Sequence, residues 1–151
     1  MGSTTTAGTS LKFSASAPAT DDLAGWTTLY ASMDLVGQIT DMGEYDRVYT
    51  LITTLPLAQR RASKYKGSYD EGSMSLVFDV DPDDVGQDGL RAQRDLDTNG
   101  YFAVTHQDGT VDFFEAMVMS ASKVVGSADQ MYTSNSTLEI NSDIIESPII
   151  P

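Results

Sequence analysis

The 151-residue sequence contains no cysteine and a single histidine, His106. A disulfide framework, a thiolate nucleophile, a cysteine-based zinc site and a cluster of imidazole ligands are therefore excluded. The sequence also has no Gly-rich phosphate loop, no dinucleotide-binding fingerprint and no G-x-S-x-G elbow. We therefore predict that the protein is not an enzyme and has no catalytic residue, no cofactor and no metal.

Basic residues are scarce: nine Lys and Arg stand against 22 Asp and Glu, which gives a formal net charge of −13. A chain this acidic does not bind duplex DNA by neutralising phosphates, and it repels a polyanion instead. No apolar run approaches the ~18 residues of a membrane helix. Residues 1–10 have neither the basic start nor the apolar core of a signal peptide. We expect a soluble protein, made in the cytosol, that does not contact a membrane.

The hydrophobic content of 40% and the length fit one folded domain. Alternating or β-branched apolar residues predict strands over 11–17, 47–55, 73–80, 101–106, 110–122 and 131–140, with shorter candidates at 26–30 and 35–39. Asp83 or Asp84 is suited to cap one helix that runs to about Leu96. Seven or eight strands and one helix predict a mainly β protein, an antiparallel sandwich or barrel with one flanking α-helix.

Three segments are expected along the chain. Residues 1–10 are small and polar and predict a flexible N-terminal segment, residues 11–146 carry the β domain, and residues 147–151 form a C-terminal tail. The apolar end, which begins at Ile144 and holds two prolines, is expected to dock against its own domain or a neighbour.

Two acidic clusters raise the alternative of a divalent metal. Residues 95–100, Asp-Leu-Asp-Thr-Asn-Gly, match the first half of an EF-hand loop, but His106 stands where the twelfth-position Glu belongs. A helix that ends at Asn99-Gly100 explains the same residues. The aspartates around Asp84 fit an N-cap with an acidic first turn better than a metal site. A small calcium- or carbohydrate-binding β-sandwich remains the alternative from another class.

Residues 56–72, expected to be a long loop after Pro56, hold four of the nine basic residues. A solvated loop explains such a cluster, but a positive segment on an acidic chain also fits a negative surface of an identical copy. Contacts of that head-to-tail kind generate rings or open stacks.

In the last predicted strand, Thr133, Asn135, Thr137 and Glu139 share one wholly polar face. Such a face suits a water-filled channel or ordinary solvent.

The order of features in residues 64–84 is a basic aromatic loop, a strand that follows Gly72, and a helix start. Together with residues 36–39, 55–76, 87–96 and 129–140, this order resembles the tail tube proteins of long-tailed, siphophage-type bacteriophages. The resemblance covers roughly residues 10–146. It rests on the order of these segments and on the kind of residues in each of them. A related tube or baseplate protein of the same fold is the nearest alternative.

The resemblance implies a virion structural protein whose copies form hexameric rings with one continuous inner barrel, stacked into a tube that conducts DNA. It implies subunit contacts from the loop at 56–72, with 31–46 as a second segment; the residues are Arg60, Arg61, Lys64, Lys66 and Tyr69. It implies an electronegative lumen with Asp79, Asp112 and Glu139, through which viral DNA passes without specific binding. The implied partners are further copies of the chain and the tape-measure, tail-tip and tail-terminator proteins. The protein is expected in the host cytoplasm during assembly and in the virion tail afterwards.

Overall fold

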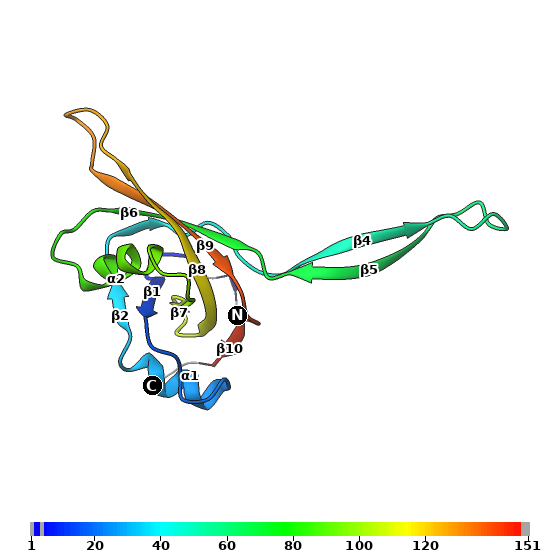
Figure 1. Cartoon of the computed structure of the whole chain (residues 1–151), viewed down its shortest axis with the longest axis horizontal. Coiled ribbons are helices and arrows are strands. Elements are labelled where there is room, and N and C mark those ends of the chain that lie inside the picture. Colours follow the sequence, from blue (N-terminus) through cyan, green and yellow to red (C-terminus); the bar gives the residue numbers. More distant parts are fainter. Residues whose placement is uncertain (1, 4, 149–151) are drawn as a thin grey trace.

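The computed structural model describes residues 2–3 and 5–148, and its strands form two separate antiparallel sheets (Figure 1). The larger sheet has the order β2-β1-β7-β8-β9-β6-β3, and β10 also pairs with β8. The smaller sheet consists of β4 and β5 and projects from the rest of the molecule. The elements are β1 (Ser10–Ser14), α1 (Leu23–Tyr30), β2 (Asp34–Val36), β3 (Ile39–Asp41), β4 (Val48–Thr54), β5 (Ser63–Asp70), β6 (Ser73–Asp79), α2 (Val85–Arg94), β7 (Gly100–Thr105), β8 (Val111–Val124), β9 (Thr133–Ile140) and β10 (Ile145–Ser147).

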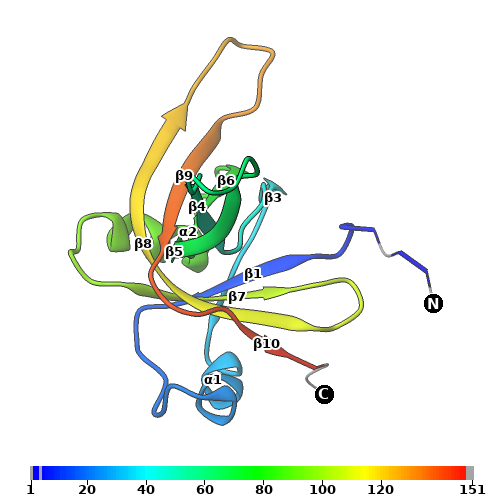
Figure 2. The same cartoon turned by 90° about the vertical axis from the view of Figure 1, so that its right-hand side faces the viewer.

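The 14-residue strand β8 joins the two halves of the larger sheet. Its first half pairs with β7 and β10, and from Ala116 onward it pairs with β9. A register shift between Val118 and Ser120 accompanies the curve that β8 follows in Figure 2. A β-bulge increases local bend and twist, so one strand can serve both halves. The prediction of a mainly β, antiparallel fold with seven to eight strands is confirmed for the larger sheet, which has eight strands, and β4 and β5 form the second sheet.

The main core lies inside this curved sheet and follows the alternation of its strands. Met74, Leu76 and Phe78 of β6 are buried, which fits the alternation of apolar and polar residues over 73–80. Phe102 packs against the rings of Phe13 and Phe114, with centroid distances of 5.2 and 5.7 Å. Each fully buried side chain of this size contributes about 1.5–3 kcal/mol relative to its exposed state.

Helix α2 begins as its sequence predicted. The Asp84 side chain accepts hydrogen bonds from the backbone N–H groups of Gly86 and Gln87 at 2.9 and 3.3 Å. The buried Gln87 amide donates to the carbonyls of Gly37 and Asp79, both at 2.9 Å. These bonds satisfy buried backbone groups and fasten the start of α2 to the end of β6 and to the turn between β2 and β3.

The short strand predicted at 26–30 is wrong: these residues belong to α1. Asp22 caps the helix by accepting from the Gly25 N–H at 2.8 Å, and Trp26 is only 1% exposed. The Trp26 ring stacks on Phe113 with centroids 5.5 Å apart. A short apolar run does not distinguish a strand from a buried helix turn, because either can cover the same surface. The described part of the chain therefore has two helices, one more than predicted.

The structure also bears on the predictions for residues 56–72, for residues 35–39 and for the two ends of the chain. The long loop at 56–72 is wrong over Ser63–Asp70, which form β5. The strand at 35–39 is interrupted after β2 at Gly37–Gln38, where Gln38 has a φ of 62°. The C-terminal segment docks on its own domain, since β10 pairs with β8. Residues 1, 4 and 149–151, which belong to the predicted terminal segments, lie outside the described residues.

Candidate assembly surfaces

The first surface is a hairpin, here called the arm, made of residues 48–70. Among the residues that the structure describes, its two strands pair only with each other, and all seven residues of β4 are exposed. Val48, Leu51 and Tyr65 are 65, 63 and 58% exposed. A lone two-stranded hairpin is marginally stable in water, and contiguous exposed apolar residues mark a contact site. The arm is therefore a surface that a partner would cover.

The pairing register divides the arm into two faces. Directly paired residues share a face, and a register shift lies between the pairs Tyr49–Tyr69 and Leu51–Lys66. The first, called the cationic face, holds Tyr49, Leu51, Thr53, Lys64, Lys66 and Tyr69. The second, called the uncharged face, holds Val48, Thr50, Ile52, Thr54, Ser63 and Tyr65. The Lys66 Nζ lies 4.8 Å from the centroid of the Tyr49 ring, which agrees with this division.

The structure brings three of the five predicted contact residues together. Lys64, Lys66 and Tyr69 share the cationic face, while Arg60 and Arg61 lie in the turn at the tip. Residues 48–69 contain four basic residues and no acidic one, so all 22 acidic residues lie elsewhere in the chain. The arm and the rest of the subunit therefore carry opposite charge.

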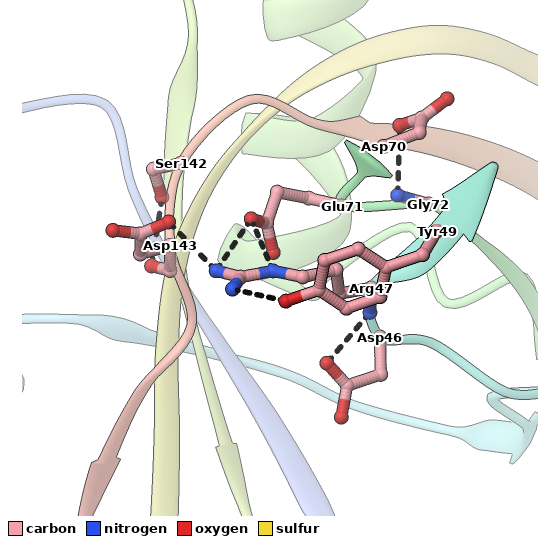
Figure 3. Close-up of polar contacts among 8 residues, drawn as sticks. All are labelled: Asp46, Arg47, Tyr49, Asp70, Glu71, Gly72, Ser142 and Asp143. Carbon is pink, nitrogen blue, oxygen red and sulfur yellow. Dashed lines mark hydrogen bonds and ion pairs between the residues drawn. The ribbon is translucent and has the colours of Figure 1, made fainter. Parts of the chain in front are cut away.

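Arg47, which sequence reasoning missed, fixes the root of the arm (Figure 3). Its Nη2 lies 2.8 Å from Glu71 Oε1 and 2.9 Å from Asp143 Oδ1, and its guanidinium lies 4.1 Å from the Tyr69 ring centroid. Hydrogen bonds to the Tyr49 hydroxyl and to Glu71 raise the pKa of Arg47. Arg47 thus connects the arm to the segment between β9 and β10. An isolated arginine before a strand gives no signal of this role, because its partners lie 24 and 96 residues away.

The turn from the arm back into β6 depends on Gly72. Its φ is +91°, and its N–H donates to Asp70 Oδ1 at 2.9 Å. A Cβ at this position would lie 2.6 Å from the backbone carbonyl oxygen of Asp46. Only glycine allows both this φ and this close approach without strain. The two strands of the arm can therefore leave and re-enter the sheet side by side.

We expect Arg47→Ala to loosen the arm while the body stays folded. The substitution leaves the Glu71 carboxylate, whose side chain is 10% exposed, without its cation, and such a loss is destabilising. Hydrogen exchange should accelerate in residues 48–70 and change little in β7 and β8, and the melting temperature should fall. Arg47→Lys is the matched control, since it keeps the charge but loses the two-partner geometry. Unchanged exchange in the arm of Arg47→Ala would contradict this role.

The second surface, called the polar sheet face, is the outward side of β6, β9 and the second half of β8. Its polar members are Ser73, Ser75, Asp79, Ser120, Ser122, Thr133, Asn135, Thr137 and Glu139, and the same pairing places Val77, Met117 and Val124 among them. On the opposite side of β9, Ser134, Ser136 and Leu138 are fully buried. The wholly polar face predicted for the last strand therefore points away from the core. Asp79 and Glu139 lie on it at opposite ends of the β6–β9 ladder.

Asp112 lies apart from these two acids. Glu139 pairs with Met117, so the alternation along β8 puts Asp112 on the other side of the strand, with the buried Phe114. There the Tyr45 hydroxyl donates a hydrogen bond to the Asp112 carboxylate, and His106 Nε2 lies 2.9 Å from it. Asp112 therefore contacts Tyr45 and His106 and does not lie on the polar sheet face.

This cluster predicts a loss of stability in alkaline solution. Burial, and then the hydrogen bond to Asp112, raise the pKa of Tyr45 above its usual value near 10. Above pH 10 the unfolded phenol loses its proton while the folded phenol keeps it, so stability falls as pH rises. Urea unfolding at pH 9 and pH 11 should show this fall in the wild type and a smaller one in Tyr45→Phe. An equal fall in both proteins would show that other groups cause it.

The acidic segment after α2 is a helix end. Asp95 follows the helix as its C-cap and lies 3.2 Å from Arg94, and Gln93 Nε2 donates to the Thr98 carbonyl at 2.7 Å. Within residues 2–3 and 5–148 there is no group of three or more His, Asp or Glu side chains placed to hold a metal ion. In the described chain, neither helix has the length and apolar character that spanning a membrane requires.

Solved structures define the class of protein to which this fold corresponds. A chain in the sheath/tube terminator of the extracellular contractile injection system PVC, in its extended state, matches with a TM-score of 0.71 and 9% identity over 98% of this chain and 99% of that one. A chain in the anti-feeding prophage baseplate gives 0.67 and 10% over 93% and 91%. A chain in the virion of a native gene transfer agent gives 0.65 and 11% over 78% and 91%. The fold is that of tail-tube-like structural subunits.

The family model described as lambda phage tail tube protein, TTP, matches residues 18–143. The chain therefore belongs to the lambda phage tail tube protein family. It is a structural component of a virion tail and not an enzyme, so the predicted family resemblance is confirmed. No match to the chain was found among curated proteins.

Proposed function

We propose that this chain is the major tail tube subunit, six copies of which close into a ring, and that the rings stack into a tube that conducts DNA. The observation that carries the proposal is the position of the polar sheet face between two open sheet edges. Met117–Val124 of β8 have a strand partner on one side only, β9, and β3 pairs only with β6 in the described chain. Joining the β3 edge of one copy to the β8 edge of the next would leave neither of these two edges open in a closed ring.

Ring closure in this way would make the polar sheet face a continuous lining. Serine, threonine and asparagine would make most of the lining hydrophilic, with Val77, Met117 and Val124 as apolar members, and Asp79 and Glu139 would make it negative. Phosphates are repelled by carboxylates, so DNA would pass without being held. Asp112 is not part of this proposal because it lies on the other side of the sheet.

The arm would make the contacts between rings. It extends well beyond the larger sheet in Figure 1, and its basic residues at the tip and on the cationic face would meet the acidic body of another copy. We propose that Arg60, Arg61, Lys64, Lys66 and Tyr69 lie at the edge of these contacts, within a β domain of residues 11–146, and that the basic side chains attract the acidic body of the other copy. Assembly would occur in the host cytoplasm around a tape-measure protein, with tail-tip and tail-terminator proteins at the two ends.

Negative-stain electron microscopy of the concentrated protein, with calcium and with chelator, tests the proposal. We expect hollow tubes or stacked rings with a central pore, and no effect of chelator. Single rings that do not stack would favour the related tube or baseplate role with the same fold. Monomers whose melting temperature rises with calcium would overturn the proposal in favour of a calcium-binding module.

A further inference from the structure

We propose that the arm packs onto a second copy through its uncharged face, while the cationic face stays hydrated and draws the copies together. This rests on the proposed function in one respect, that the partner of the arm is another copy of the chain. It adds which face forms the buried contact and what each face contributes to the strength and the speed of association.

The uncharged face has the chemistry of an interface centre. Val48, Ile52 and Tyr65 are 65, 49 and 58% exposed and are accompanied by threonine and serine. A Cβ at Gly67 would lie 2.9 Å from Ile52 Cδ1, so the glycine leaves the Ile52 side chain uncovered. The uncharged face ends at the root of the arm, where Val48 pairs with the charged residue Asp70. Aromatic and aliphatic side chains without charges are what the buried centre of a protein interface contains.

The cationic face is poorly suited to burial. Its aromatic rings already have cations beside them: the Arg47 guanidinium lies 4.1 Å from the Tyr69 ring centroid, and the Lys66 ammonium lies 4.8 Å from that of Tyr49. Burying this face would remove water from Lys64 and Lys66, and lysine is depleted in interface centres for that reason. The lysines can instead remain at the rim, where charge mainly affects the rate of association.

Charge identifies a second copy as the occupant. Residues 48–69 carry four basic residues and no acidic one, and the remaining residues carry all 22 acids of the chain. In Figure 1 the arm points away from the larger sheet, so it cannot fold back onto the acidic body of its own subunit without leaving its root. The root is held by the ion pairs of Arg47 with Glu71 and Asp143. Another copy offers the complementary charge in a head-to-tail contact.

Two adjacent aliphatic residues of β4 provide a matched test. Ile52 and Leu51 are 49 and 63% exposed and lie on opposite faces. Ile52→Asn and Leu51→Asn make similar changes in size and polarity, and both monomers should melt within about 2 °C of the wild type because neither side chain is in the core. We expect Ile52→Asn to weaken self-association by at least about tenfold and Leu51→Asn by less than about threefold, as measured by analytical ultracentrifugation.

The lysines give a second, kinetic measurement. The double variant Lys64→Gln, Lys66→Gln should slow association at low salt and reduce its salt dependence, with little change in the dissociation rate. Light scattering after dilution and after concentration jumps separates the two rates. Faster dissociation with an unchanged association rate would show that the lysines lie inside the contact, and would overturn their assigned role.

The outcomes also separate this inference from the proposed function. Equal or greater weakening by Leu51→Asn would overturn the inference even if tubes form. A wild-type protein that associates through the uncharged face, but forms no rings or tubes in micrographs, would support the inference and contradict the tube role. A wild-type protein that stays monomeric at every concentration reached would overturn the inference, because the arm would then have no second copy as its partner.

Discussion

Replacing residues 50–68 with Asn-Gly should give a folded monomer that forms neither rings nor tubes. Tyr49 and Tyr69 are directly paired, so a two-residue type I′ turn between them closes the shortened hairpin without changing its register. The deletion removes four basic residues and the exposed residues Leu51, Ile52 and Tyr65, and it leaves Arg47 and Glu71 in place at the root. The larger sheet shares no strand pairing with the arm, so its melting temperature should stay within a few degrees of the wild type.

Sedimentation velocity and negative-stain microscopy, under conditions in which the wild type assembles, measure the effect. A scrambled tip, with residues 56–61 reordered in place, is the matched control because it keeps both strands and their faces. Assembly by the protein without the arm would refute the assignment of this surface. Unfolding of that protein, seen by circular dichroism, would instead show that the arm stabilises the monomer.

Trp26→Ala should lower the free energy of unfolding by about 3–5 kcal/mol, the usual cost of removing a fully buried large aromatic side chain. The Trp26 side chain is 1% exposed and lies between α1 and the outer side of the larger sheet, within 5.7 Å of the Tyr101 ring centroid. Its indole N–H donates to Asp21 at 3.2 Å. A domain of this size has roughly 5–15 kcal/mol of stability in total, so the loss is a large fraction.

Urea unfolding followed by circular dichroism measures the difference in the free energy of unfolding between Trp26→Ala and the wild type. Leu23→Ala is the matched control, because Leu23 lies in the same helix but is 39% exposed and should change stability by less than about 0.5 kcal/mol. A change below about 1 kcal/mol in Trp26→Ala would mean that α1 contributes little to the fold.

The helix α2 and the hairpin between β7 and β8 are examples of structure that local sequence determines. Asp84 caps α2, and Asp108-Gly109 supports a turn in which the His106 N–H and the Thr110 carbonyl are bonded at 2.8 Å. The alternation that predicted the buried side of β6 also predicted the polar side of β9. These signals involve neighbours within a few residues, so they can be read without knowing the rest of the chain.

Other parts depended on residues far away in the sequence. The run at 26–30 became a helix because it covers Phe113, and residues 63–70 became a strand because β4 is available to pair with them. The faces of the arm follow from a register shift that composition does not reveal. Arg47 gained its role from Asp143, 96 residues later.

The sequence by itself therefore determined the β content, the capped helix α2 and the family resemblance. It also determined that residues 48–69 carry basic residues and no acidic one. These depend on residue type, spacing and local backbone preference, which act over a turn or a strand. Only the tertiary structure decided which side of a strand Asp112 occupies, which face of the arm carries its lysines and what holds the arm in place. These depend on pairing and packing between distant segments, whose energies a local pattern does not contain.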